Sequence, residues 1–233
     1  MTVAVTVFPG SNCEQDVVFA LNDLGVEAEL VWHREKDLSG FSGVVLPGGF
    51  AHGDYLRTGA IARFSPVMAE VRRLAGDGAP VLGICNGFQI LTEAGLLPGV
   101  LLANRDLRFI CRPVHIRVES TTSILTRSAR VGDVLEIPLN SYEGNYTMDP
   151  ANPSGRVVLT YSDANGTVSE AANPNGSADN VAGIADRAGN VAGLMPHPER
   201  AIETLLGSTD GRVLLESFGA SVWEFAAGKP AHV

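Results

Sequence analysis

Apolar and polar positions follow two periodicities along the first half of the chain. Short, almost wholly apolar runs are typical of buried strands. Between them stand stretches whose apolar residues recur every three or four positions, as in helices. The predicted strands are 3–8, 27–32, 43–46 and 80–84, and the predicted helices are 14–24, about 57–74 with a break before Pro66, and 86–94. Strands that alternate with helices favour a parallel sheet built from βαβ units.

After Leu97 the pattern changes. Val114, Ile116 and Val118 alternate with polar residues, which is typical of a half-exposed strand. Two further features are a strand at 157–161 and a hairpin over 181–194 that turns at 188–190. The last helix carries an apolar stripe that we interpret as core packing, formed by Leu214, Phe218 and Phe225. We therefore expect an α/β protein whose mostly parallel central sheet has an antiparallel extension, in one domain over residues 1–233.

The strongest chemical motif surrounds Cys85, where an apolar strand gives way to a helical pattern. Gly83 and Gly87 flank it in the spacing G-x-C-x-G, the thiol version of the nucleophile elbow. In so sharp a turn, side chains at the two glycines would collide with neighbouring backbone. The sulfur would lie at the start of a helix, whose dipole favours a thiolate. The motif predicts Cys85 as a nucleophile; the alternative is a buried cysteine at an ordinary βα turn.

A thiol nucleophile needs an imidazole to take its proton and a third group to orient that imidazole. His197 and Glu199 are separated by one residue near the C-terminus, and Pro196 and Pro198 flank His197. The prolines favour an extended backbone, in which residues two apart face the same side. We therefore predict that His197 and Glu199 face one spot together. The alternative is a surface loop with an incidental histidine and a solvated glutamate.

Three further residues fit a site for amide cleavage. The Gly48-Gly49 turn follows a predicted strand, and we predict the N–H groups of Gly49 and Asn86 as donors to an oxyanion. Gln89 lies one helical turn after Cys85, where it can hydrogen-bond a substrate. An ordinary βα turn and a solvated helix residue are the alternatives. Cys13 is a rival nucleophile without flanking glycines, and Cys111 is expected in the core.

Composition narrows the class of protein. The 233 residues carry a formal net charge of −9 and no basic block, so we expect no nucleic-acid binding. No apolar run reaches membrane-spanning length, and the N-terminus has no pattern of a signal peptide. Three widely spaced cysteines suggest no disulfide framework, which favours the cytoplasm, and no metal-ligand spacing is present.

In their order along the chain, these motifs resemble those of the class I (triad) glutamine amidotransferases. The matching segments are 47–49, 83–89 and 197–199. The resemblance implies a flavodoxin-like three-layer sandwich. It also implies that Cys85 is the nucleophile, His197 the general base and acid, and Glu199 its orienter. Glutamine would be cleaved to glutamate and ammonia through a γ-glutamyl thioester.

A narrower resemblance, to family members that act in purine biosynthesis, is carried by the segments 8–13, 48–50 with 53–57, 173–177, 195–200 and 207–211. In these, ammonia passes to a large synthetase subunit that uses ATP and Mg²⁺ to convert formylglycinamide ribonucleotide to its amidine. A small accessory subunit bridges the two. The resemblance thus implies both subunits as partners, no cofactor in this chain, and weak glutaminase activity without the partner.

One segment departs from the commonest pattern of these members. Where a His-Gly-Glu-Gly run is expected, the chain has Ser141-Tyr142-Glu143-Gly144. Residues 140–142 resemble a segment that binds glutamine partly through backbone, which makes Ser141 and Tyr142 candidate substrate-binding residues beside Gln89. The groups that hold the α-amino and α-carboxylate groups stay open. Two other functions also stay open, a stand-alone thiol hydrolase (γ-glutamyl hydrolase or peptidase) and a catalytically silent regulatory subunit.

Overall fold

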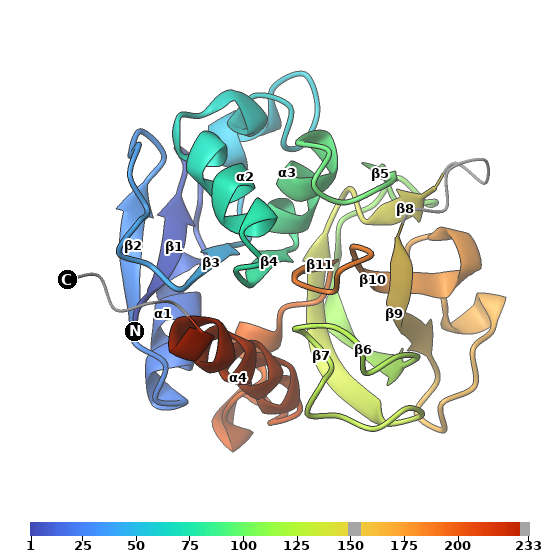
Figure 1. Cartoon of the computed structure of the whole chain (residues 1–233). Coiled ribbons are helices and arrows are strands. Elements are labelled where there is room, and N and C mark those ends of the chain that lie inside the picture. Colours follow the sequence, from blue (N-terminus) through green and yellow to red (C-terminus); the bar gives the residue numbers. More distant parts are fainter. Residues whose placement is uncertain (149–154, 229–233) are drawn as a thin grey trace.

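A nine-stranded mixed sheet runs through the computed structural model, which describes residues 1–148 and 155–228. The strand order is β2-β1-β3-β4-β11-β10-β9-β6-β7 (Figure 1). The first five strands in this order are parallel: β2 (Ala28–Trp32), β1 (Val3–Val7), β3 (Gly43–Leu46), β4 (Val81–Ile84) and β11 (Val191–Leu194). The other four pair antiparallel: β10 (Val181–Ala185), β9 (Arg156–Ser162), β6 (Ile110–Val118) and β7 (Val134–Ser141). This confirms the predicted parallel sheet with its antiparallel extension.

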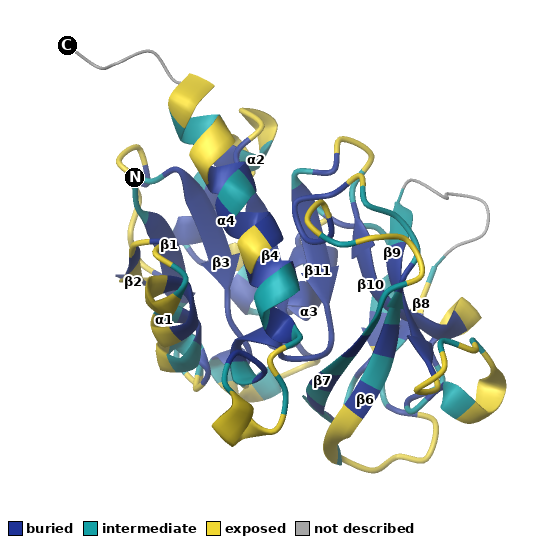
Figure 2. Cartoon of the chain, turned by 90° about the horizontal axis from the view of Figure 1, so that it is seen from below, coloured by how far each residue is buried: buried dark blue, intermediate teal, exposed yellow. Residues whose placement is uncertain are grey.

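Helices cover both faces of the parallel half. On one face lie α2 (Val67–Gly76) and α3 (Asn86–Glu93), and on the other lie α1 (Glu14–Asp23) and α4 (Gly211–Gly228) (Figure 1). Because both faces are covered, every residue of β3 and β4 is buried (Figure 2). Leu214 and Phe218 of α4 are fully buried and Phe225 partly so, which confirms that the apolar stripe packs against the core.

The strand β11 joins the two halves of the sheet. It pairs antiparallel with β10, as the predicted hairpin requires, and parallel with β4 on its other side, where Gly193 lies opposite Gly83. The ends of β4 and β11 therefore meet at one edge of the sheet. The N–H of Cys85 donates to the carbonyl of Leu194 there, at 2.8 Å. A separate two-stranded sheet, β5 (Val100–Leu102) with β8 (Asn145–Thr147), lies beside the end of α3 (Figure 1).

The predicted helix over 57–74 is wrong in its first part. The helix α2 begins only at Val67, after a 3₁₀ turn at Ala62–Phe64. Before that turn the backbone takes positive φ angles at Leu56 and Gly59, which a helix cannot contain. Gly59 packs against the backbone of Gln89 in α3, so this segment follows the surface of α3 instead of forming a helix of its own.

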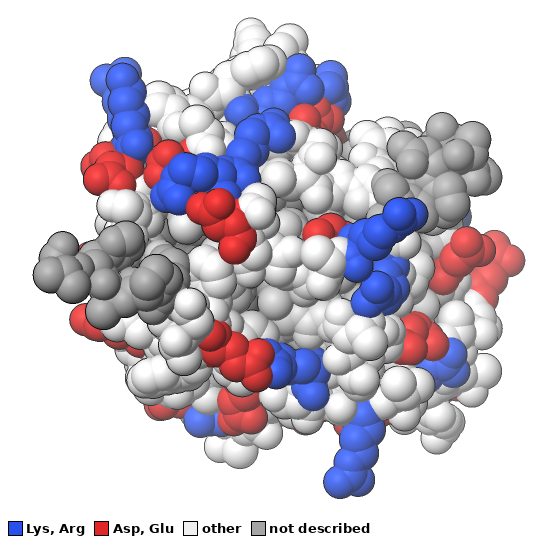
Figure 3. All heavy atoms as spheres, in the orientation of Figure 1, with Lys and Arg blue, Asp and Glu red and all other residues white. Residues whose placement is uncertain are grey.

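Acidic and basic side chains are interspersed on the molecular face drawn in Figure 3, and neither sign gathers into a large patch there. Within the described part of the chain, none of the helices combines the length and the apolar character that crossing a membrane requires.

Candidate active site

Cys85 lies in a strained turn between β4 and α3. Its backbone has φ 50° and ψ −106°, outside the regions that a non-glycine residue usually adopts. A Cβ on Gly87 would lie 1.9 Å from the carbonyl oxygen of Leu46, and one on Gly83 would lie 2.7 Å from the backbone of Gly87. The two glycines therefore let strand and helix approach each other closely, as the sequence motif predicted. The turn places the sulfur at the N-terminus of α3.

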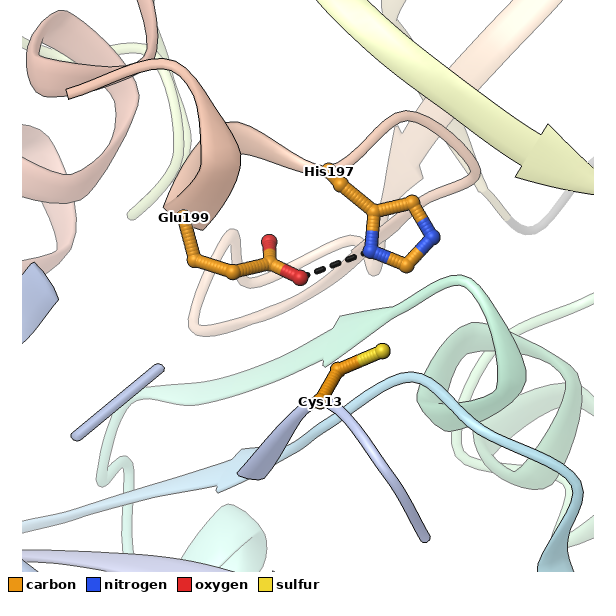
Figure 4. A group of neighbouring side chains, drawn as sticks. All are labelled: Cys13, His197 and Glu199. Carbon is orange, nitrogen blue, oxygen red and sulfur yellow. Dashed lines mark hydrogen bonds and ion pairs between the residues drawn. The ribbon is translucent and has the colours of Figure 1, made fainter. Parts of the chain in front are cut away.

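His197 and Glu199 form a buried pair immediately after β11. The ring Nδ1 lies 2.6 Å from Oε1 of Glu199, and the side chains are 2% and 0% exposed (Figure 4). The two side chains do meet, but not through an extended backbone, so that part of the prediction is wrong. Pro198 begins a 3₁₀ turn over Pro198–Arg200, and the turn carries the carboxylate back onto the ring. With Nδ1–H donating to the carboxylate, Nε2 is left without a partner among the described residues.

The charge state of His197 depends on its neighbours. Burial alone would lower its pKa, but the Glu199 carboxylate and the thiols of Cys85 and Cys13 raise it, and the net pKa is well above the ordinary value. A protonated imidazole beside a cysteine is the arrangement that acid–base catalysis at a thiol requires.

Cys85 and His197 line one cavity of about 240 Å³. Pockets for drug-sized ligands span roughly 300–1,000 Å³, so this cavity suits a smaller molecule. Cys85 is 6% exposed, and its thiol donates to the carbonyl of Asn140 at 3.4 Å, which ties this candidate nucleophile to the end of β7. The cavity also contains all three predicted substrate-binding residues, Gln89, Ser141 and Tyr142.

The two predicted oxyanion donors differ in placement. Gly49 lines the cavity and has φ 145°. Gly49 and Ser11 lie opposite each other in an isolated antiparallel β-bridge. The hydrogen bonds of this bridge are donated by the N–H groups of Asn12 and Phe50, so the N–H of Gly49 takes no part in it. Asn86 is the first residue of α3, so its N–H has no acceptor within the helix, but Asn86 is not among the residues that line the cavity. The role of either N–H group stays a prediction.

The predicted substrate-binding residues already make contacts within the protein. Gln89 is buried; its Nε2 donates to the carbonyl of Glu143 at 2.6 Å, and its Oε1 accepts from Asn86 at 2.8 Å. The backbone carbonyls of Ser141 and Tyr142 accept hydrogen bonds from Asn104. These contacts hold the wall of the cavity in place, and the Tyr142 side chain stays exposed at its mouth.

Cys13 lies against the catalytic candidates, which the sequence did not predict. Its sulfur faces the imidazole ring of His197 (Figure 4), and the sulfur also accepts from Arg200 at 3.2 Å. One ligating atom each from Cys13, His197 and Glu199 lies within 4.8 Å of the others, so the donor types of a soft metal site are present. The hydrogen bonds of this group account for its geometry without an ion. Cys111, expected in the core, is exposed.

Two acidic residues in the cavity wall were also not predicted as site residues. Asp54 ends the 3₁₀ turn Ala51–Asp54, and Glu143 follows β7; both line the cavity. Burial, together with the nearby Glu143 carboxylate, raises the pKa of Asp54 to about 6. The segment Gly53–Arg57 stood out in the sequence, but nothing in it shows that Asp54 lies near Glu143, which is 89 positions further along the chain.

Comparison with known proteins agrees with this geometry. The model of the CobB/CobQ-like glutamine amidotransferase domain matches residues 1–216. Phosphoribosylformylglycinamidine synthase subunit PurQ from Koribacter versatilis is 50% identical over 93% of this chain and 96% of its own. The subunit of the same name from Chlorobaculum parvum is 52% identical over 94% and 90%. A chain in the structure of PurLQS from Thermotoga maritima is 40% identical, with a TM-score of 0.85 over 93% of this chain and 96% of that one.

Proposed function

Because the chain belongs to the family of CobB/CobQ-like glutamine amidotransferase domains, we propose that it hydrolyses the side-chain amide of L-glutamine at Cys85 and supplies the ammonia to a synthetase. The observation that carries the proposal is the meeting of Cys85, on its strained elbow, with the buried His197–Glu199 pair in one small cavity. A catalytically silent subunit would have no use for this arrangement.

In this mechanism the thiol proton of Cys85 rests on Nε2 of His197, the ring nitrogen without a partner among the described residues, which the raised pKa of His197 favours and which leaves Cys85 as a thiolate. The sulfur attacks the amide carbon, and N–H groups at Gly49 and Asn86 stabilise the resulting oxyanion. His197 then gives this proton to the amide nitrogen, the C–N bond breaks and ammonia leaves, while Glu199 holds the ring in place. Water, activated by the same imidazole, releases glutamate from the γ-glutamyl thioester.

We further propose the partners. The similarity to PurQ subunits across nearly their whole length supports a large synthetase subunit and a small accessory subunit of a phosphoribosylformylglycinamidine synthase. ATP and Mg²⁺ would act on the synthetase subunit, which makes phosphoribosylformylglycinamidine for purine biosynthesis. The three cysteines are free, which fits the reducing cytoplasm. A stand-alone hydrolase is not favoured, since relatives of the same length are synthase subunits.

The decisive experiment replaces the nucleophile in the reconstituted complex. With Cys85→Ala, glutamine-dependent synthesis of the amidine should fall to background, while synthesis from added ammonium salt should persist, because the synthetase needs only ammonia. Cys111→Ala, at an exposed thiol, is the matched control and should keep both activities. Glutamine-dependent synthesis by Cys85→Ala would refute the proposal.

The nucleophile can also be identified directly. A glutamine-like electrophile should label the chain once, at Cys85, and glutamine should protect it. Peptide mapping separates this result from labelling at Cys13, which lines the same cavity. A label on Cys13, with Cys85 unlabelled, would show that the nucleophile is Cys13 and that our mechanism is wrong on this point.

A further inference from the structure

Asp54 and Glu143 place two carboxylates in the wall of the active-site cavity. Neither forms an ion pair with any described residue. Arg57, close in sequence, binds Glu93 at 2.5 Å, and Arg200, which lines the same cavity, binds Asp16 at 2.9 Å. Two like charges in a half-buried site repel each other, and the raised pKa of Asp54 reflects this repulsion as well as burial.

Hydrogen bonds fix one oxygen of each carboxylate. Asn86 donates from Nδ2 to Oδ1 of Asp54 at 3.3 Å, and Thr58 donates from its hydroxyl to Oε2 of Glu143 at 2.9 Å. Asn86 is itself held by Gln89 and by the N–H of Ala51. The second oxygen of each carboxylate, Oδ2 and Oε1, makes no hydrogen bond to any described residue and is available to a ligand.

Asn86 links the pair to the candidate nucleophile. It directly follows Cys85 and its side chain donates to Asp54, and Cys85, Asp54 and Glu143 all line the one cavity. In glutamine, two methylene groups separate the amide carbon from the α-carbon. A second observation also shows that the cavity is built for a polar ligand: Nε2 of His197, a side chain 2% exposed in the same cavity, has no partner among the described residues.

We infer that Asp54 and Glu143 form the subsite for the α-ammonium group of the substrate. The inference rests on the proposed glutaminase function. An ammonium group has three N–H donors and one positive charge, so it can satisfy both free oxygens and relieve the repulsion between the carboxylates. The subsite selects free glutamine over an amide that lacks the α-ammonium group.

The test compares two substrates in the reconstituted complex: glutamine and 4-carbamoylbutanoate, which is glutamine without its α-amino group. Both release ammonia, which is measured directly. Wild-type complex should prefer glutamine. Asp54→Asn and Glu143→Gln should each lower kcat/KM for glutamine by about 10- to 100-fold, mainly through KM, because a hydrogen bond between charged groups is lost. For 4-carbamoylbutanoate, kcat/KM should stay within about threefold, since that substrate never makes the bond.

The controls separate the possible failures. Asp179→Asn, at an exposed aspartate outside the cavity, should leave kcat/KM unchanged for both substrates. If Asp54→Asn and Glu143→Gln lose kcat/KM equally for both substrates, the carboxylates only shape the cavity. If both variants prefer glutamine as strongly as wild type does, the ammonium group binds elsewhere. Either result overturns the inference. Failure of the proposed function looks different, since the wild-type complex would then release no ammonia from glutamine.

The pH profile gives an independent readout. The carboxylate of Asp54, with a pKa raised to about 6, is protonated in more acidic solution and then no longer attracts a cation. The ratio of kcat/KM for glutamine to that for 4-carbamoylbutanoate should therefore fall as the pH drops through about 6. The ratio removes effects on the triad that both substrates share. In Asp54→Asn the ratio should be flat over this range, and a ratio that still falls would contradict the assignment.

Discussion

Asp54 lowers the stability of the fold at neutral pH. Its pKa is 3.8 in its ordinary state and about 6 in the fold, so folding takes up a proton between these values. Stability therefore falls as the pH rises from about 4 to 6 and is level above that. Asp54→Asn removes the charge, and we predict that it raises the unfolding free energy by about 1–2 kcal/mol at pH 7.5, a figure reduced for the partial exposure of the group.

Urea unfolding of the isolated chain at several pH values checks this prediction. The gain in stability should be fully present above about pH 6, shrink as the pH falls from about 6 to 4, and vanish only below about pH 3, where the carboxyl group is protonated in both folded and unfolded states. Asp179→Asn should show no such pH-dependent gain. If Asp54 serves binding and not folding, Asp54→Asn should be more stable than wild type and should bind glutamine less well. A less stable Asp54→Asn would show instead that the carboxylate supports the fold.

Residues that carry their own local motif were predictable. Cys85 is marked by its flanking glycines, and His197 and Glu199 by their spacing on either side of Pro198. Cys13, Asp54 and Glu143 lack such a signal, because their importance comes from contacts between segments far apart in the chain. Periodicity shows which face of an element is buried, but not which residue of another element it meets.

At the scale of elements, the strands and helices with clear periodicity were predicted well, and the short turns were not. The helix α3 and the strand β3 end where the sequence indicated, within one residue. The sequence predicts an extended segment where the structure has the 3₁₀ turn Pro198–Arg200, because proline fits either conformation at the first position of a turn. Three residues are too few for a period to show, so packing against neighbours decides the conformation.

The elbow between β4 and α3 gives a prediction at this scale. In Gly87→Ala the new methyl group would overlap the carbonyl of Leu46, so strand and helix must move apart. We expect a loss of about 2–3 kcal/mol in the unfolding free energy, together with slower labelling of Cys85 by the glutamine-like electrophile.

The matched control is Gly76→Ala in α2, where the added methyl group meets nothing within 4 Å. It should be neutral or stabilise the chain by up to about 1 kcal/mol, because alanine favours a helix. Urea unfolding measures both variants. Equal effects of the two substitutions would show that close packing at the elbow is unimportant.

At the scale of the whole molecule, β11 explains how the site is assembled. The sequence predicted a hairpin and assigned it to the antiparallel extension, but β11 also pairs in parallel with β4. That pairing brings the end of β11, and with it His197, to the edge where Cys85 lies. Strand neighbours depend on contacts between distant segments, so local periodicity predicted the strands but not their order.

The surface beside the cavity gives the last prediction. Tyr55 and Leu56 are 73% and 83% exposed and follow directly after Asp54 in the cavity wall, and exposed apolar residues in a group are typical of interaction surfaces. We expect this surface to contact the synthetase subunit, so that ammonia leaves the cavity into the partner. Leu56→Asp should weaken binding to the synthetase subunit by about tenfold or more. Leu56 has φ 72°, which aspartate adopts more readily than leucine, so the variant should fold.

Titration of the chain against the synthetase subunit measures this binding, with glutamine-dependent ammonia release as a second signal. That release should be weak for the isolated chain and rise on complex formation, and in Leu56→Asp the rise should require a higher concentration of partner. Labelling of Cys85 in the isolated variant should match wild type, since the substitution lies outside the cavity. Leu205→Asp, at a leucine that is 90% exposed and does not line the cavity, should bind normally. Normal binding by Leu56→Asp would show that the synthetase subunit binds another face of the chain. Ammonia would then leave by a route other than the mouth of the cavity.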